Sequence, residues 1–206
     1  MVWATPLASF TMPEDGIIDP ILSFFIFFGM SVVWFALAEE IGMRGYLQPH
    51  LMSLGRTPAL LLVGLVFATW HLPLIFLAPA AANFPTGNLL LFFPMFYGTF
   101  VAASFFFGYL RIYTGSIWPA SIAHAVHNAV WNVVGAFTLI TASPVLVEVY
   151  LVGDFGLLIL IGTAIGAIWF GHRFKSGMDQ AQSDADAEVP RVAPAVPTAP
   201  AAPTTR

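Results

Sequence analysis

The sequence predicts an all-α protein, a polytopic transmembrane helix bundle with about five spans and a disordered C-terminal tail. Of its 206 residues, 58% are hydrophobic and 9% are charged, against about 25% charged in an ordinary soluble domain. Five long segments carry almost no charge, and a membrane-spanning helix needs about 20 apolar residues. From residue 176 the composition shifts to Ala and Pro with few large side chains, which is typical of a disordered segment.

The first predicted span is the Phe-rich run 21–38, which has no charged residue. Its helix is expected to continue through Glu39 and Glu40 and to be stopped by Pro49, because proline lacks a backbone N–H and clashes with the preceding turn. The N-terminus lacks the basic region of a cleavable signal peptide, so we expect this span to remain as an anchor.

The second and third predicted spans are equally apolar. The second runs from about 58 to 82 and is interrupted only by His71 and Pro73. The third covers 89–110, where two tyrosines are the only ionisable side chains. Both segments are long enough to cross the bilayer as helices.

The fourth and fifth predicted spans complete the bundle. Residues 112–147 carry no charge, and the turn-like Thr114-Gly115-Ser116 before Pro119 predicts a helix start near 116. The fifth span runs from about 155 to 171. We therefore expect a transmembrane domain at 1–175 and a disordered Ala/Pro-rich cytoplasmic tail at 176–206.

Basic residues fall on one side of these spans. They are Arg44, Arg56, Arg111, Arg173 and Lys175. Short cytoplasmic loops carry the excess of Lys and Arg, so we expect an integral protein of the plasma membrane with its N-terminus outside and its C-terminus in the cytoplasm. The formal net charge of −4 argues against a nucleic-acid partner, and the absence of Cys excludes thiolate chemistry.

Several polar side chains nevertheless lie in or at the ends of the spans. They are Glu39, Glu40, Arg44, His71, His124, His127 and Asn128. An ionisable group in a membrane span costs about 2.5–3.5 kcal/mol on insertion scales and by default marks a functional site. In contrast, Phe67, Trp70 and the run 105–107 are expected to pack or to face lipid.

Helical spacing groups these side chains. Glu40 and Arg44 are four residues apart, so the guanidinium can neutralise the carboxylate, whereas Glu39 points about 100° away. His124 and Asn128 share one helix face, and His127 is a poorer second member. The depths of these groups are compatible with a polar cavity that opens to the cytoplasm between three helices.

Such a set can hydrolyse an amide. Glu39 would be the general base, with His71 as its partner on the attacking water. His124 and Asn128 would stabilise the oxyanion. Glu40 and Arg44 would support the first carboxylate.

Three short motifs also carry a resemblance to a family. Glu39-Glu40-Ile41-Gly42-Met43-Arg44, Phe67-Ala68-Thr69-Trp70-His71 and His124-Ala125-Val126-His127-Asn128 resemble the EExxxR, FxxxH and HxxxN motifs of the CPBP (CAAX protease and bacteriocin-processing, or Abi) intramembrane proteases. The resemblance covers about residues 35–135. Met43 stands where the family often has Phe, and five spans are fewer than in many relatives.

The resemblance implies an activity like that of the type II CAAX prenyl endopeptidase, which removes the last three residues of prenylated proteins at the cytosolic face. It implies the same roles for Glu39, His71, His124 and Asn128. Bacterial relatives are associated with peptide maturation, bacteriocin immunity and quorum signalling. The expected partners are therefore the lipid bilayer and a membrane-associated peptide or protein substrate, possibly lipidated, while the oligomeric state stays open.

Three alternatives remain open at this point. Glu39, His71 and His124 could ligate zinc with water in the fourth position, although we favour a reaction without a cofactor. The chain could be a non-catalytic membrane scaffold or bacteriocin-immunity protein of the same fold. A small transporter or channel fits less well, because its polar residues would be spread along a path through the bilayer.

Overall fold

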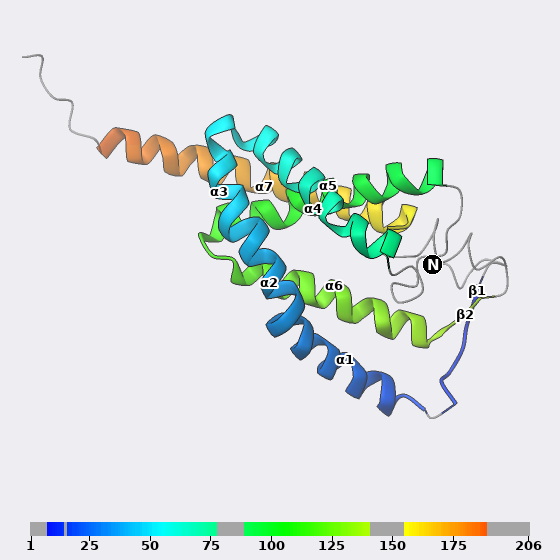
Figure 1. The fold of residues 1–206 in the computed structure, drawn as a ribbon. Helices are drawn as coiled ribbons and strands as arrows, with labels where there is room; N and C mark the ends of the chain where they lie inside the picture. Colours follow the sequence, from blue (N-terminus) through cyan, green and yellow to red (C-terminus); the bar gives the residue numbers. More distant parts are fainter. Residues whose placement is uncertain (1–7, 15, 78–88, 141–154, 189–206) are drawn as a thin grey trace, which may run out of the picture.

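The computed structural model describes residues 8–14, 16–77, 89–140 and 155–188. Its elements, labelled in Figure 1 where there is room, are β1 (Ala8–Phe10), α1 (Ile18–Met30), η2 (Ser31–Ala36), α2 (Leu37–Glu40), η3 (Ile41–Leu47), α3 (Gln48–Leu51), η4 (Met52–Leu54), α4 (Arg56–Leu77), α5 (Leu89–Thr114), α6 (Trp118–Ala136), β2 (Thr138–Ile140) and α7 (Leu157–Glu188). The predicted helical transmembrane bundle is confirmed.

Three helices in the described part of the chain are long and apolar enough to cross a membrane. They are Ile18–Leu54, Arg56–Leu77 and Leu90–Thr114, and a shorter apolar helix covers Leu157–Arg173. The predicted second span extended to 82, and its residues beyond Leu77 lie outside the described ranges. The chain is therefore an integral membrane protein built from helices.

The first helix continues past Pro49, so the predicted stop at this residue is wrong. Elements α1 to η4 form one helical rod from Ile18 to Leu54. Pro49 follows the π-helical turn η3, in which the backbone N–H of Gln48 bonds the carbonyl of Met43, five residues back. The wider π turn accommodates the proline at the first turn of α3, where its missing N–H does no harm. The rod ends at Gly55, whose φ of 96° suits glycine.

Helix α5 lies between α4 and α7, and α6 packs against α1 and η2 (Figure 1). The close approach of α4 to α5 requires Gly64, because a methyl group there would lie 2.7 Å from Cα of Val101. A cluster of aromatic rings fills the space between α4, α5 and the short segment before α7; it includes Phe67, Phe96, Phe100 and Phe155.

The fourth predicted span is shorter as a helix than expected. Helix α6 ends at Ala136, and the following strand β2 pairs antiparallel with β1, with Ser9 opposite Leu139. The hydroxyl of Thr138 donates to the carbonyl of Val134 at 2.6 Å. This side chain satisfies a carbonyl that the next helical turn would have used, and residues 141–147 lie outside the described ranges.

The C-terminal boundary also differs from the prediction. Helical backbone of α7 continues to Glu188, whereas composition predicted a disordered segment from 176. Residues 189–206 of that segment lie outside the described ranges, so their disorder stays a prediction.

Candidate active site

The site is built around a buried ion pair on the first helix. Glu40 ends α2 and Arg44 lies one turn later in η3. The Nη1 atom of Arg44 donates to Oε1 of Glu40 at 2.9 Å, and both side chains have no exposed surface. The pairing predicted from the four-residue spacing is therefore present. π-helical turns on both sides of α2 (η2 and η3) are the kind of helix irregularity that often accompanies functional sites.

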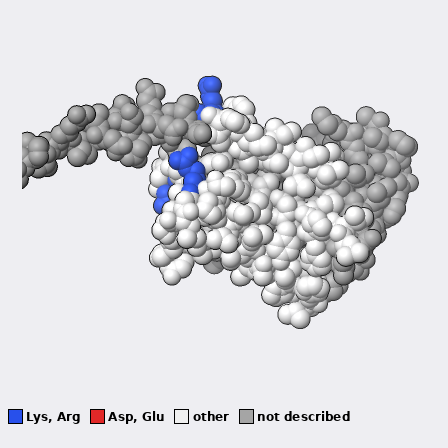
Figure 2. Space-filling model, turned by 90° about the horizontal axis from the view of Figure 1, so that it is seen from above, with Lys and Arg blue, Asp and Glu red and all other residues white. Residues whose placement is uncertain are grey.

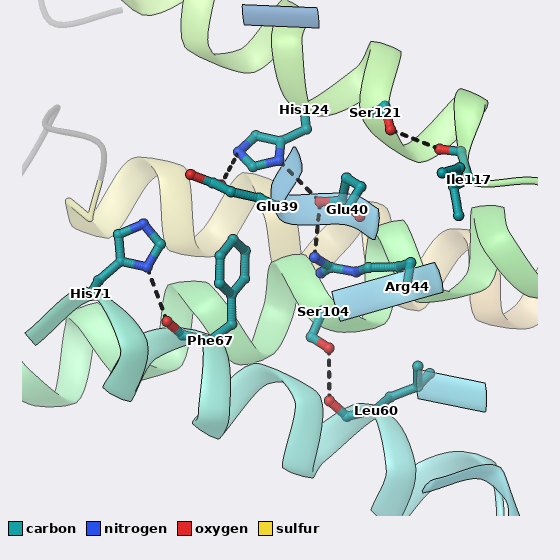
Figure 3. Close-up of polar contacts among 10 residues, drawn as sticks. All are labelled: Glu39, Glu40, Arg44, Leu60, Phe67, His71, Ser104, Ile117, Ser121 and His124. Atoms are coloured by element: carbon teal, nitrogen blue, oxygen red, sulfur yellow. Dashed lines mark hydrogen bonds and ion pairs between the residues drawn. The ribbon is translucent and has the colours of Figure 1, made fainter. Parts of the chain in front are cut away.

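His124 of α6 brings the two glutamates together (Figure 3). Its Nδ1 lies 3.0 Å from Oε1 of Glu40, and its Nε2 lies 3.6 Å from Oε2 of Glu39. The two carboxylates leave the first helix in different directions but meet opposite edges of one imidazole ring. The Glu39 side chain is 21% exposed, against 0% for Glu40, so Glu39 is the more accessible of the two carboxylates.

Two aromatic rings enclose the ion pair. Phe67 of α4 and Phe107 of α5 each lie 5.3 Å from the guanidinium carbon of Arg44, within cation–π distance. The Phe107 ring also stacks on His124, with centroids 5.3 Å apart and an interplanar angle of 21°. From the sequence, both phenylalanines were expected to pack or to face lipid. Nothing in the sequence indicated that α5 contributes a residue, Phe107, to the site.

His71 lies beside this cluster rather than within its hydrogen bonds. Its Nδ1 lies 3.0 Å from the carbonyl oxygen of Phe67, one turn back on α4. A carbonyl only accepts, so Nδ1 carries the proton and Nε2 of the neutral ring is an acceptor. In Figure 3 this second nitrogen points to the side on which Glu39 lies. The Phe67 ring contacts both imidazoles, with centroid distances of 5.0 Å to His71 and 6.2 Å to His124.

Asn128 follows His124 by one turn and also faces the first helix. Its Nδ2 donates to Oγ of Ser31 at 3.2 Å, and Ser31 is fully buried at the start of η2. The structure thus places His124 and Asn128 on one face, as predicted, with Ser31 as an additional partner. A serine inside an apolar run is the only sequence signal that could have identified it.

Gln48 extends the polar face of the first helix by a further turn. Its Nε2 donates to the carbonyl of Gly108 on α5 at 3.2 Å, and the side chain is 2% exposed. This contact ties the first helix to α5 just beyond Arg44. Sequence reasoning did not single out Gln48, although it continues the spacing of Glu40 and Arg44.

Zinc is the alternative cofactor for this site. Among the described residues, no group of three or more His, Asp or Glu side chains is arranged to hold a metal ion. In the alternative ligand set, Nδ1 of His71 faces the Phe67 carbonyl, and the two ring nitrogens of His124 face the carboxylates of Glu39 and Glu40. We therefore derive no step that passes through zinc.

The geometry supports acid–base chemistry. Oε1 of Glu40 accepts from Arg44 and faces Nδ1 of His124, so Nδ1 carries a proton. Nε2 lies 3.6 Å from Oε2 of Glu39, an ion-pair distance when the ring is protonated at both nitrogens. In that state, an imidazolium lies beside a carboxylate that can accept a proton from water.

The comparison with protein-family models identifies a family for the chain. The family model described as type II CAAX prenyl endopeptidase Rce1-like matches residues 21–130. This range includes every residue of the cluster described above. Searches of curated proteins and of solved structures give no match.

Proposed function

Because the chain belongs to the Rce1-like family of type II CAAX prenyl endopeptidases, we propose that it is an intramembrane endopeptidase in which Glu39 activates water. The family supports a CAAX-protease type of peptide-bond hydrolysis at the membrane. The observation that carries the residue assignment is the contact of His124 with both Glu39 and Glu40. The imidazole of His124 lies beside the accessible carboxylate of Glu39, and the buried Glu40–Arg44 pair holds this imidazole in place.

The reaction begins with transfer of a proton from water to Glu39. The water oxygen forms a bond to the carbonyl carbon of the scissile peptide, and the carbonyl electron pair moves to oxygen. His124, as imidazolium, donates to this oxyanion, and Asn128 supplies a second donor from the same helix face. Glu39 then returns the proton to the leaving nitrogen as the C–N bond breaks, which gives one carboxyl and one amine terminus.

His71 positions the attacking water in this scheme. Because Nδ1 donates to the Phe67 carbonyl, Nε2 is left to accept a hydrogen bond from water. Glu40 does not act as the base, since it has no exposed surface and already interacts with Arg44 and His124. Its role is to hold His124 with Nδ1 protonated.

The substrate is a membrane-associated peptide or protein, with or without a lipid anchor, and the active face is cytoplasmic. Figure 2 shows the Lys and Arg side chains of one face gathered at one end, with no Asp or Glu on the described part of that face. The described basic residues other than buried Arg44 are Arg56, Arg111, Arg173 and Lys175. An excess of Arg on one side supports an N-terminus outside and a C-terminus in the cytoplasm of the plasma membrane.

The test is cleavage of a library of membrane-associated peptides by the full chain in liposomes, read by mass spectrometry. We expect cleavage by the wild type and by Glu14→Gln, a control at an exposed glutamate, and none by Glu39→Gln. Cleavage should persist with a chelator. Loss with chelator that zinc restores would establish the zinc alternative, and no cleavage by folded wild type would favour the non-catalytic scaffold.

A further inference from the structure

Three buried polar side chains form a line on one face of the first helix. Glu40, Arg44 and Gln48 follow one another at intervals of four residues, with exposed fractions of 0%, 0% and 2%. Beyond the hydrogen bonds already described, four of their atoms are buried without a hydrogen-bond partner in the described part of the chain. These are Oε2 of Glu40, Nε and Nη2 of Arg44, and Oε1 of Gln48.

Four such atoms on neighbouring turns are costly. Each buried, unsatisfied polar group costs about 1–3 kcal/mol, and more when it is charged. Native proteins satisfy most buried polar atoms with protein groups or with ordered water. Arg44 has no exposed surface, and Phe67 and Phe107 pack against its guanidinium, so neither lipid headgroups nor bulk solvent contact it. We therefore expect a bound polar ligand to satisfy these atoms.

The four atoms match the hydrogen-bonding capacity of water. Two are donors, both on Arg44, and two are acceptors, on Glu40 and Gln48. One water accepts two hydrogen bonds and donates two, and buried waters typically make about three. An anion would complement the donors on Arg44 but would be repelled by the Glu40 carboxylate.

Gln48 packs closely against α5. Position 108 of α5 is a glycine, and a methyl group there would lie 3.3 Å from Oε1 of Gln48 and would also collide with Leu60. A larger side chain at 108 would therefore press on this acceptor. Helix α5 also supplies the Gly108 carbonyl that accepts from Nε2 of Gln48, while Phe67 and Phe107 cover Arg44 with apolar rings.

We propose that the protein binds water in a closed site formed by Glu40, Arg44 and Gln48. This water is distinct from the one that Glu39 activates, because it lies behind the ion pair rather than at the exposed carboxylate. By bonding Oε2 of Glu40, it fixes the plane of the carboxylate whose other oxygen faces His124. The proposal depends on burial and hydrogen bonding, and it holds whether or not the chain is a protease.

X-ray hydroxyl-radical footprinting of the full chain in nanodiscs tests this site, because radiolysis of a trapped water labels the side chains beside it. Phe67 and Phe107 are 2% and 7% exposed, and Phe96, at 0%, is a matched control inside the aromatic cluster. We expect labelling of Phe67 and Phe107 but not of Phe96 in the wild type. Equal labelling of all three rings at background level in folded protein would overturn the proposal.

Two variants locate the water. Gln48→Met removes an acceptor with little change in volume and should abolish the labelling of Phe107, whereas Gln48→Glu keeps an acceptor oxygen and should retain it. Labelling that is unchanged in folded Gln48→Met would come from water at Glu39 and would contradict the assignment. If Gln48→Met does not fold, the test is the labelling of Phe107 relative to Phe96 in the wild type and in Gln48→Glu. Labelling of Phe107 above that of Phe96 in both proteins supports the water site, and equal labelling contradicts it. None of these readouts requires activity.

Discussion

Nδ1 of His124 lies 3.0 Å from Oε1 of Glu40, and the same oxygen accepts a hydrogen bond from Arg44 at 2.9 Å. One buried carboxylate oxygen therefore joins a guanidinium of its own helix to an imidazole 84 residues away. This arrangement fixes the ring so that Nε2 faces Glu39. The predictions below follow from it and from the packing that supports it.

Removal of the guanidinium should destabilise the protein more than removal of the whole pair. Arg44→Met leaves the Glu40 carboxylate buried without its cation, and breaking a buried pair in this way costs about 3–5 kcal/mol. Arg44→Met combined with Glu40→Gln removes both charges and should recover much of that loss. Denaturant unfolding in detergent measures both variants, and a single variant as stable as the wild type would contradict the account.

The two imidazoles should differ in their effect on stability. His124→Ala removes the partner of both glutamates and the ring that stacks on Phe107, so both activity and thermal stability should fall. His71→Ala removes only a hydrogen bond within α4 and ring contacts, so activity should fall with a smaller loss of stability. Parallel melting curves and cleavage rates separate the two, and equal melting temperatures for both variants would count against the described contacts.

Ser31 should act as a positioning residue for Asn128. Ser31→Ala removes the hydrogen bond that Nδ2 of Asn128 donates to Oγ of Ser31, worth about 0.5–1.5 kcal/mol. We expect a lower kcat with little change in KM, and rescue by Ser31→Thr, which keeps the hydroxyl. Loss of stability without a change in kcat would show that the contact only supports the fold.

The contact between α4 and α5 should depend on Gly64. In Gly64→Ala the added methyl would lie 2.7 Å from Cα of Val101, a backbone atom that cannot rotate away, and overpacking of this kind costs about 1–3 kcal/mol. Gly162→Ala is the matched control, because no atom lies within 4 Å of the added methyl, and alanine favours a helix by about 1 kcal/mol. If both variants melt alike, the helices are not as close as described.

Local spacing in the sequence was enough to predict the helical bundle and part of the site. Hydrophobic run length identified the three long apolar helices and the shorter one at Leu157–Arg173, and the four-residue spacing of Glu40 and Arg44 predicted their ion pair. Spacing also predicted that His124 and Asn128 share a face. These features depend on neighbours within one helix, which is why one sequence reveals them.

The features that sequence reasoning missed depend on contacts between helices. Whether a π turn replaces an α turn depends on packing, so continuation through Pro49 could not be read from the residue alone. The contact of both glutamates with His124, and the stacking of Phe107 on that ring, require knowledge of which helix faces which. Phe107 gives no local signal, because it is one of three consecutive phenylalanines.

The central claim is that Glu39 is the base that activates water, and its most direct test is the cleavage rate of one identified peptide substrate by full-length protein in liposomes. Loss of a general base costs about 10²–10⁴-fold in rate. Glu39→Gln should therefore lose at least this much activity while it melts like the wild type, and Glu14→Gln should cleave normally. A folded Glu39→Gln protein that cleaves at the wild-type rate would contradict the account.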